Sequence, residues 1–217
     1  MVVVLAGGTG GAKLARGMLD VLGAGELVVI ANTGDDAELY GVHVSPDPDL
    51  VSYWLADVID ERGWGIAGDT WEVMDALHAA GQPAWFRLGD RDLAMCLLRT
   101  QRLRAGERLT EAHEAVVRAL GVEARVLPMS DDPVATWVRS GGAWRPFQEF
   151  MILERGSDPE AVERAYAGVI DAVVADERAD SVPALETDVL MDTPEARRRV
   201  AKETLDFAQT LNQVPGT

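Results

Sequence analysis

The sequence is poor in cysteine, in lysine and in positive charge overall. Cys96 is the single cysteine, so an intramolecular disulfide is excluded. Only Lys13 and Lys202 are lysines, and 36 acidic side chains against 20 basic ones give a formal charge of −16. Because such a surface repels phosphate backbones and anionic headgroups, we expect neither nucleic-acid nor membrane-surface partners.

A signal-peptide pattern and low-complexity tracts are also missing. The chain opens on an apolar run without a basic segment, so we expect an unprocessed, cytoplasmic protein. With 47% hydrophobic and 26% charged residues, the composition is that of a folded globular protein. The preference for arginine over lysine fits either a salt-adapted surface or a GC-rich genome. An acidic protein must attract an anionic substrate locally, through glycine amides, arginines or a divalent metal.

A glycine-rich segment follows the first apolar run. The β-branched stretch over 2–5 predicts a buried strand, and Leu14, Met18 and Leu22 then have helical spacing. A strand, a glycine loop and a helix in succession present free amides to an anion. The segment matches neither a Walker loop nor the G-x-G-x-x-G pattern, and a tight turn without a ligand is the alternative. The candidate nucleotide-binding residues are Gly7, Gly8, Thr9, Gly10, Gly11 and Lys13.

Acidic residues follow the ends of the expected strands. A strand over 26–31 precedes Asp35 and Asp36, and a proline-set loop containing Asp47 and Asp49 precedes a helix over 50–59. Asp35 and Asp36 are candidate ligands of a divalent ion held against a pyrophosphate, with an exposed Asx turn as the alternative. Expected strands over 85–88 and 124–127 also end in acidic segments. The sequence therefore predicts three acidic strand ends at one edge of a sheet.

The other segments complete an α/β pattern. Glycines alternate with tryptophans over 63–71, which suits either a flat aromatic ligand or core packing. The only composition change lies over 153–163, so we predict a single domain over residues 1–217. Its expected fold is α/β and Rossmann-like, with three layers, a mostly parallel sheet, a β-hairpin and a C-terminal helix. The remaining elements are helices over 71–80 (capped by Asp69 or Thr70), 93–103, 110–121 and 193–211, a short helix at 157–160, a hairpin around Gly141-Gly142, and strands over 169–175 and 187–190.

Seven motifs together resemble the 2-phospho-L-lactate transferase (CofD) family. They are AGGTGGAK, ANTGDD, VSPDPD, GWGIAGDTW, FRLGDRDLA, LPMSDDPV and FQEF, in this order. The resemblance runs from Met1 to about Glu154, so residues 1–154 form a motif-bearing core and residues 155–217 a shortened C-terminal part. The family's Gly-Pro-Ser-Asn-Pro motif and the α/β stretch around it are absent from this sequence.

The resemblance implies a group transfer. Family members move a 2-phospho-L-lactyl or phosphoenolpyruvyl group from a guanosine-diphosphate-linked donor to the deazaflavin Fo, with Mg²⁺, and release GMP and F420-0. It implies Fo contacts at Asp49 and Arg87, a nucleotide site over Gly7–Lys13 and an acidic metal side at Asp35 and Asp36. It also implies a homodimer.

The chemistry of that reaction assigns roles to individual residues. Amides and Mg²⁺ would neutralise the diphosphate, and Asp49 would orient or deprotonate the acceptor hydroxyl. Arg87 or Arg91 would hold a phosphate or a carboxylate, with a surface ion pair and a helix-cap pair as the alternatives. The candidate catalytic residues are thus Asp35, Asp49 and Arg91. The alternative functions are a regulatory relative that binds nucleotide sugars without chemistry, and an inactive shortened paralogue.

Overall fold

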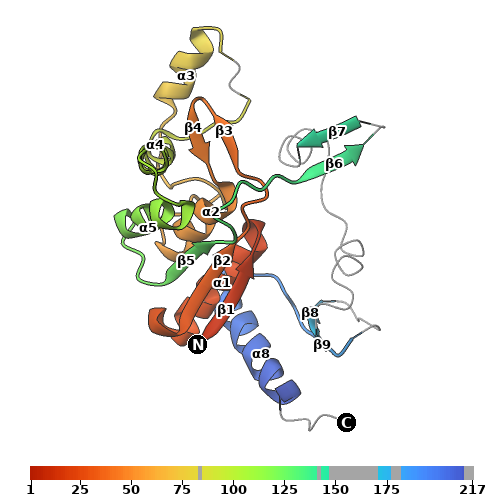
Figure 1. The fold of residues 1–217 in the computed structure, drawn as a ribbon. Coiled ribbons are helices and arrows are strands. Elements are labelled where there is room, and N and C mark those ends of the chain that lie inside the picture. The colour runs from red at the N-terminus through yellow and green to blue at the C-terminus, as the bar shows by residue number, and fades with distance from the viewer. Residues whose placement is uncertain (83–84, 141–142, 147–170, 177–181, 213–217) are drawn as a thin grey trace.

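A small parallel sheet forms the centre of the molecule. The computed structural model describes residues 1–82, 85–140, 143–146, 171–176 and 182–212. The sheet has the strand order β1-β2-β5, and both pairings are parallel (Figure 1). Its strands are rich in valine and leucine, which pack well on a pleated, buried surface. They are β1 (Val2–Ala6), β2 (Leu27–Ala31) and β5 (Arg125–Pro128).

Helices connect these strands and pack on one another. Gly17 lies where the first helix crosses the last, and a Cβ at this position would run into the Arg197 carbonyl. None of the helices in the described part of the chain combines the length and apolarity needed to traverse a lipid bilayer. The helices are α1 (Gly8–Leu22), the 3-10 turn η1 (Ala24–Glu26), α2 (Pro46–Leu55), α3 (Glu72–Ala79), α4 (Asp90–Arg104), α5 (Leu109–Ala119) and α8 (Pro194–Asn212).

Three two-stranded units lie outside the central sheet. The β6–β7 hairpin extends away from the body of the molecule (Figure 1). Its strands flank the predicted Gly141-Gly142 turn, which itself lies outside the described residues. The units are the antiparallel pair β3 (Ala37–Leu39) and β4 (Val42–Val44), the antiparallel pair β6 (Trp137–Ser140) and β7 (Ala143–Pro146), and the parallel pair β8 (Val173–Ala175) and β9 (Ala184–Glu186).

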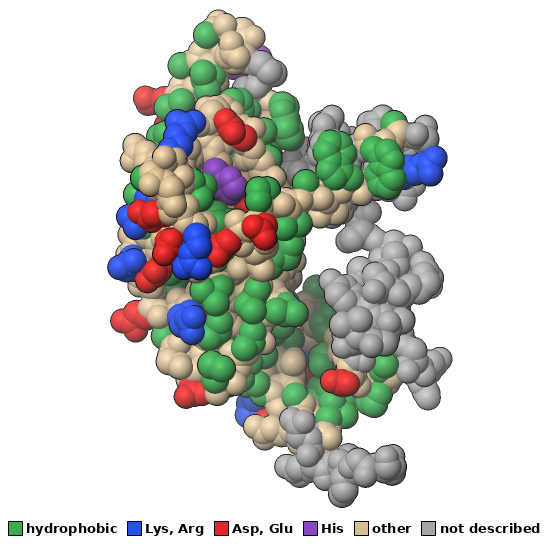
Figure 2. Space-filling view, in the orientation of Figure 1, with side chains coloured by type: hydrophobic (Ala, Val, Ile, Leu, Met, Phe, Trp, Pro, Cys, Tyr) green, Lys and Arg blue, Asp and Glu red, His purple; other side chains and the backbone are tan. Residues whose placement is uncertain are grey.

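The helices around the sheet lie on one of its faces. Val4, Val29 and Val126 point into a core that also contains Met18 of α1 and Trp54 of α2. Both connections, β1 to β2 and β2 to β5, step across the sheet in the same direction, and right-handed connections then place their helices on the same side. The predicted α/β class, parallel sheet, β-hairpin and C-terminal helix are therefore confirmed. The opposite face carries apolar side chains that reach the surface, where Figure 2 shows hydrophobic atoms over the sheet.

Several predicted elements differ in the structure. Residues 85–88 form no strand. Trp85 and Phe86 contact each other edge to face, with ring centroids 5.7 Å apart. The last predicted strand is displaced, because β9 ends at Glu186 and residues 187–190 have no regular structure. Of the strand predicted over 169–175, residues 171–175 are described, and β8 occupies Val173–Ala175. The FQEF motif, the predicted helix at 157–160 and the composition change over 153–163 lie outside the described residues.

Three helices begin earlier than predicted. α1 starts within the glycine segment at Gly8, and α2 starts at Pro46, so that Asp47 and Asp49 lie in its first turn and not in a loop. Proline at the first helical position explains the second case, because its fixed φ suits a helix start and its missing N–H would have no partner there. α4 starts at Asp90. The acidic residues at the starts of α2 and α4 therefore lie in the first turns of helices.

Candidate active site at the sheet edge

The carboxyl ends of the three parallel strands meet at one edge of the sheet. The Asn32 amide donates to the Ala6 carbonyl at 2.9 Å, and the Met129 amide donates to the Ala31 carbonyl at 2.8 Å. These two hydrogen bonds continue the pairing of the sheet one residue beyond the strands. They hold the segments that follow β1, β2 and β5 side by side. Ligands of open α/β sheets bind at such an edge.

Asn32 and Asp47 connect the segments that leave this edge. Asp47, in the first turn of α2, accepts hydrogen bonds from the Gly8 amide at 2.8 Å and from Asn32 Nδ2 at 2.9 Å. The Gly34 amide donates to Asn32 Oδ1 at 2.9 Å, which closes the turn after β2. Burial raises the pKa of Asp47, while the Asn32 and Gly8 hydrogen bonds oppose that rise. The start of α1, the turn after β2 and the start of α2 thus form one polar cluster.

Asp35 is the member of this cluster with unsatisfied oxygen. Among the described residues its buried Oδ1 atom has no hydrogen-bond partner, and Asn32 Nδ2 approaches Oδ2 only to 3.4 Å. Burial, followed by the negative charges of Asp47 and Asp36, raises the pKa of the Asp35 carboxyl to about 6. A bound divalent cation would relieve both effects. Oxygen ligands are those that Mg²⁺ prefers, so Asp35 fits the predicted metal.

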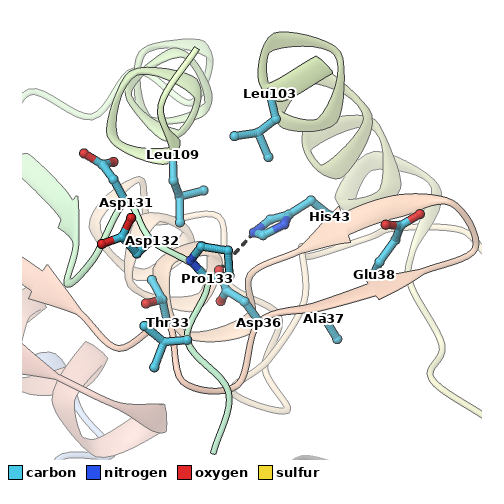
Figure 3. Close-up of a pocket in the computed structure, with 11 residues that line it drawn as sticks. Thr33, Asp36, Ala37, Glu38, His43, Leu103, Leu109, Asp131, Asp132 and Pro133 are labelled. Atoms are coloured by element: carbon cyan, nitrogen blue, oxygen red, sulfur yellow. Dashed lines mark hydrogen bonds and ion pairs between the residues drawn. The ribbon is translucent and has the colours of Figure 1, made fainter. Parts of the chain in front are cut away.

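Asp36 is engaged by protein groups instead. Its carboxylate accepts from Ser45 Oγ at 2.8 Å and pairs with His43 Nε2 at 2.9 Å. Figure 3 shows the His43 ring and the Asp36 carboxylate facing each other beside a pocket of about 310 Å³. Leu103, Leu109 and the buried Thr33 also line this pocket. Of the two predicted metal ligands, Asp35 therefore has the free oxygen, and Asp36 holds the β4–α2 corner.

The start of α1 offers amides. Gly7 at the N-cap position has no side chain that could cap this helix, and of the first amides the Gly8 amide is taken by Asp47. Gly8 has a φ of +72°, which a residue with a Cβ adopts only with strain. The Thr9 and Gly10 amides occupy the first turn, where helix geometry supplies no acceptor. Lys13 forms an ion pair with Asp192 at 2.7 Å. The predicted nucleotide-binding residues thus lie at one helix start, with Lys13 paired to the segment before α8.

Asp49 has a different environment from the one expected of a base. Arg99 Nη1 and Nη2 donate to its two oxygens at 2.6 and 2.8 Å, and Arg99 Nη2 also donates to the His43 carbonyl at 2.9 Å. Both side chains are buried. Both oxygens of this carboxylate are therefore committed to the Arg99 guanidinium. The predicted role of Asp49, to orient or deprotonate the acceptor hydroxyl, stays a prediction.

Arg99 is a residue that the sequence reasoning missed. It lies within a mostly apolar helical stretch, and no motif marks it. Burial disfavours its charge, but the Asp49 carboxylate outweighs burial and raises the Arg99 pKa above its usual value. By binding Asp49 and the His43 carbonyl together, Arg99 joins α4 to the corner between β4 and α2.

A second acidic side chain lies beside this pair. Tyr53 donates to Asp92 at 2.7 Å, and burial together with the Asp49 charge raises the Asp92 pKa to about 7. Within the described ranges, Asp49, Asp92 and Cys96 are the one group of three side chains with metal-ligand atoms within 4.8 Å of one another. Arg99 already supplies the positive charge there, with Nη2 at 3.6 Å from Cys96 Sγ. Cys96 is fully buried.

The two predicted substrate arginines lie elsewhere on the surface. Arg87 pairs with Asp75 at 2.7 Å and lies 5.5 Å from the Trp71 ring centroid, so the surface ion pair that we weighed for it is present. Arg91 binds the Ala67 carbonyl. None of the contacts found for these two arginines reaches the Asp35 cluster.

The acidic segment around Asp90 forms a pair of helix caps and not a strand end. Asp69 accepts from the Arg91 and Asp92 amides at 2.9 and 3.1 Å and so caps α4. Asp90 accepts from the Glu72 and Val73 amides, each at 3.1 Å, and so caps α3. Each helix is thus capped by the segment that precedes the other. The prediction that Asp69 or Thr70 caps the helix at 71–80 is wrong, because Asp69 is committed to α4.

Comparison with known proteins assigns the chain to a family. The family model described as 2-phospho-L-lactate transferase CofD matches residues 2–189. The chain belongs to the CofD family. It is similar to the 2-phospho-L-lactate transferase of Methanosarcina acetivorans, with 39% identity over 80% of this chain and 56% of the relative. It is also similar to the phosphoenolpyruvate transferase of Kitasatospora aureofaciens, with 42% identity over 79% and 58%.

The match to individual CofD proteins is partial in length. A third relative, the 2-phospho-L-lactate transferase of Methanothermobacter thermautotrophicus, is 40% identical over 84% of this chain and 60% of its own length. The chain therefore spans 56–60% of the length of these three relatives. The resemblance read from the seven motifs is confirmed at the level of the family.

Proposed function

We propose that this chain transfers a 2-phospho-L-lactyl or phosphoenolpyruvyl group from a guanosine-diphosphate-linked donor to Fo, giving F420-0 and GMP. The observation that carries the proposal is the polar cluster at the sheet edge, where the start of α1 and Asp35 lie together in a CofD chain. The names of the relatives cover both acyl groups. The proposed Mg²⁺ cofactor, the homodimer and the cytoplasmic location rest on the resemblance and the sequence.

The start of α1 is the proposed site of the donor diphosphate. The Thr9 and Gly10 amides point along the helix axis, where the helix dipole also favours negative charge. Lys13 can leave its partner Asp192 and bind a phosphate oxygen with little loss of free energy. Asp192 is exposed, and ion pairs with an exposed partner contribute little to stability. These groups draw an anionic donor to one place on a protein of charge −16.

Asp35 is the proposed acidic group of the reaction. Its free Oδ1 atom and raised pKa suit a ligand of Mg²⁺, and without the ion they suit a group that takes a proton from a hydroxyl near neutral pH. Bound Mg²⁺ would neutralise charge on the diphosphate as the GMP leaving group departs. Asn32 and Asp47 hold the Asp35 turn against α1, which keeps the acidic group beside the donor.

Other predicted residues take supporting roles in this proposal. Asp49 has an indirect, positioning role. It binds Arg99, Arg99 donates to the His43 carbonyl, and the His43 ring pairs with the Asp36 carboxylate. Arg87 keeps its proposed contact with Fo, since its exposed guanidinium lies beside the Trp71 ring. In the pocket beside Asp36, Leu103, Leu109 and Pro133 offer apolar contacts to part of a flat ligand, while Glu38, Asp131 and Asp132 add carboxylates to the lining.

Mass spectrometry of the reaction products tests the proposal. The purified chain is incubated with Fo, the guanylated phospholactate donor and Mg²⁺, in low salt and in molar KCl. We expect GMP and F420-0 from the wild type and from Glu114→Gln, a matched change at an exposed ion pair. We expect turnover at least about 100-fold slower from Asp35→Asn, the size typical of losing a group that acts on the transition state. Binding of Fo or GDP without product would instead indicate a non-catalytic relative, and binding of neither would overturn the site.

A further inference from the structure

The tryptophans of the glycine-rich segment over 63–71 contact two arginines. Trp64 is 51% exposed, so core packing, one of the two alternatives for this segment, is excluded for its side chain. The Arg62 guanidinium carbon lies 4.3 Å from the centroid of the Trp64 ring and 5.2 Å from that of Trp71. Arg87 lies 5.5 Å from the Trp71 centroid. Aromatic and cationic groups thus alternate in these four side chains, which we call the tryptophan-arginine platform.

The loop that carries Trp64 is closed by hydrogen bonds. The Asp60 amide donates to the Gly65 carbonyl at 3.1 Å, and the Gly63 amide donates to the Asp60 carbonyl at 2.8 Å. Gly63 and Gly65 have φ values of +86° and +71°, which glycine adopts without strain. The Asp60 carboxylate also accepts from Arg62 Nε at 2.5 Å. The two glycines therefore form a tight loop that presents Trp64, and Asp60 holds Arg62 beside it.

The other end of the platform is fixed by a buried cluster. Trp71 directly precedes α3 and packs, partly buried, against the second group of core side chains. That group includes Val42, Met74 and Leu88. A platform that is already ordered before a ligand arrives loses little conformational entropy on binding.

The platform lies next to the start of α1. A Cβ added at Gly63 would lie 3.8 Å from the Thr9 Cγ2 atom, so the loop and the first turn of α1 are in van der Waals contact. Arg87 is therefore connected with the proposed donor site through the platform and this loop. A ring that lies on the platform can direct its attached chain toward the amides at the start of α1.

The chemistry of the platform favours one kind of ring. An indole is an electron-rich aromatic group whose faces carry negative charge. It therefore stacks best on a flat, electron-poor ring, and a deazaflavin, which accepts electrons, is such a ring. Guanine, the base of the proposed donor, is flat but electron-rich and complements an indole less well.

We propose that Trp64 stacks on the deazaflavin ring of Fo, while Arg62 holds the indole from its other face. The ribityl chain of Fo then runs toward the start of α1, where its hydroxyl meets the donor phosphate. This assignment rests on the proposed function and deepens it, because it names the side chain that recognises the ring of the acceptor.

Binding of Fo without the donor tests the assignment. The full chain and its variants are titrated with Fo, and in a second series with GDP, by isothermal titration calorimetry. Trp64→Ala should raise the Kd for Fo at least about tenfold, the size typical of losing one stacked aromatic side chain, and should leave the Kd for GDP unchanged. Trp64→Phe should recover part of the affinity, because it keeps a ring in place. Trp144→Ala, at another exposed tryptophan, should bind Fo as the wild type does.

Three results would overturn the assignment. They are a wild type that binds no Fo, a Trp64→Ala variant that binds Fo as tightly as wild type, and a loss of affinity that falls on GDP and not on Fo. The last result would make the donor base the ring on the platform. Failure of the proposed reaction is distinguishable, because a chain that binds Fo through Trp64 but forms no F420-0 would contradict the reaction alone. Product formation by Trp64→Ala with an unchanged KM for Fo would contradict the assignment alone.

Discussion

Arg99 carries a positive charge with no solvent exposure, and Asp49 supplies the carboxylate that balances it. Arg99→Ala would leave the Asp49 carboxylate buried and unpaired, so we expect a loss of about 3–5 kcal/mol in the free energy of unfolding, measured with urea. Arg99→Lys should recover only part of this lost stability, because one ammonium group does not reproduce the bidentate contact of the guanidinium with Asp49. Arg118→Ala is the control, since its ion pair is exposed and contributes at most about 0.5 kcal/mol. Equal losses in Arg99→Ala and the control would contradict this role.

The Asp35 carboxyl has a pKa of about 6 in the folded chain and a reference value of 3.8. Because folding raises the pKa of an acid here, its ionised form opposes folding. The penalty is absent below about pH 4 and complete above about pH 6. Asp35→Asn should therefore raise the free energy of unfolding at pH 7 by roughly 1 kcal/mol after allowance for partial exposure, and raise the Tm at pH 7 but not at pH 4. Thermal melts of both proteins across this pH range measure it, and parallel curves would refute it.

Mg²⁺ should act on the same residue with the opposite sign. A cation bound at Asp35 stabilises the ionised carboxylate, so millimolar Mg²⁺ should raise the wild-type Tm at pH 7. Asp35→Asn should lose this response, whereas Asp188→Asn, at an exposed carboxylate, should keep it. A response that survives in Asp35→Asn would place the ion elsewhere.

At the scale of elements, local pattern located most helices and the two longer buried strands correctly. Local pattern did not predict the β3–β4 hairpin. This hairpin turns at Tyr40 and Gly41, both with positive φ, and tyrosine is not typical of such a turn. The apolar run over 85–88 predicts a strand, but a short run does not reveal whether a sheet has a place for it.

The candidate site divides in the same way. Asp35 and the start of α1 follow from their positions after strands, because parallel strands end at one edge. The pairing of Asp49 with Arg99 depends on how α4 packs against α2, and the two residues lie 50 positions apart in the chain, so no local pattern predicts it.

The crossing of α1 and α8 at Gly17 gives a prediction at the same scale. Gly17→Ala adds a Cβ where the Arg197 carbonyl lies, so α8 must shift, and we expect a loss of about 1–3 kcal/mol despite the better helix propensity of alanine. Gly10→Ala in the same helix is the control, because nothing lies within 4 Å of its added Cβ. Urea unfolding compares the two. Similar stability in both variants would mean that α8 does not depend on close approach at Gly17.

At the scale of the whole molecule, the charge of −16 is the dominant property. Self-repulsion of this size opposes the compact state, and salt screens it within about 10 Å at 0.1 M ionic strength. The Tm should therefore rise by several degrees between low salt and 1 M KCl. NaCl should act as KCl does, since screening depends on ionic strength. A Tm that stays constant or falls as salt is added would show that repulsion among the acidic side chains does not destabilise the folded state.

The exchanged caps of α3 and α4 have a consequence for how the chain opens. Asp69, which precedes α3, accepts hydrogen bonds from the first amides of α4, and Asp90, at the start of α4, accepts them from the first amides of α3. If either segment is displaced, the helix start that it caps loses its hydrogen-bond acceptor. The two starts should therefore behave as one cooperative unit in native-state exchange. The Val73 and Arg91 amides, 18 residues apart in the chain, should then become accessible to deuterium in a single opening event with the same dependence on denaturant.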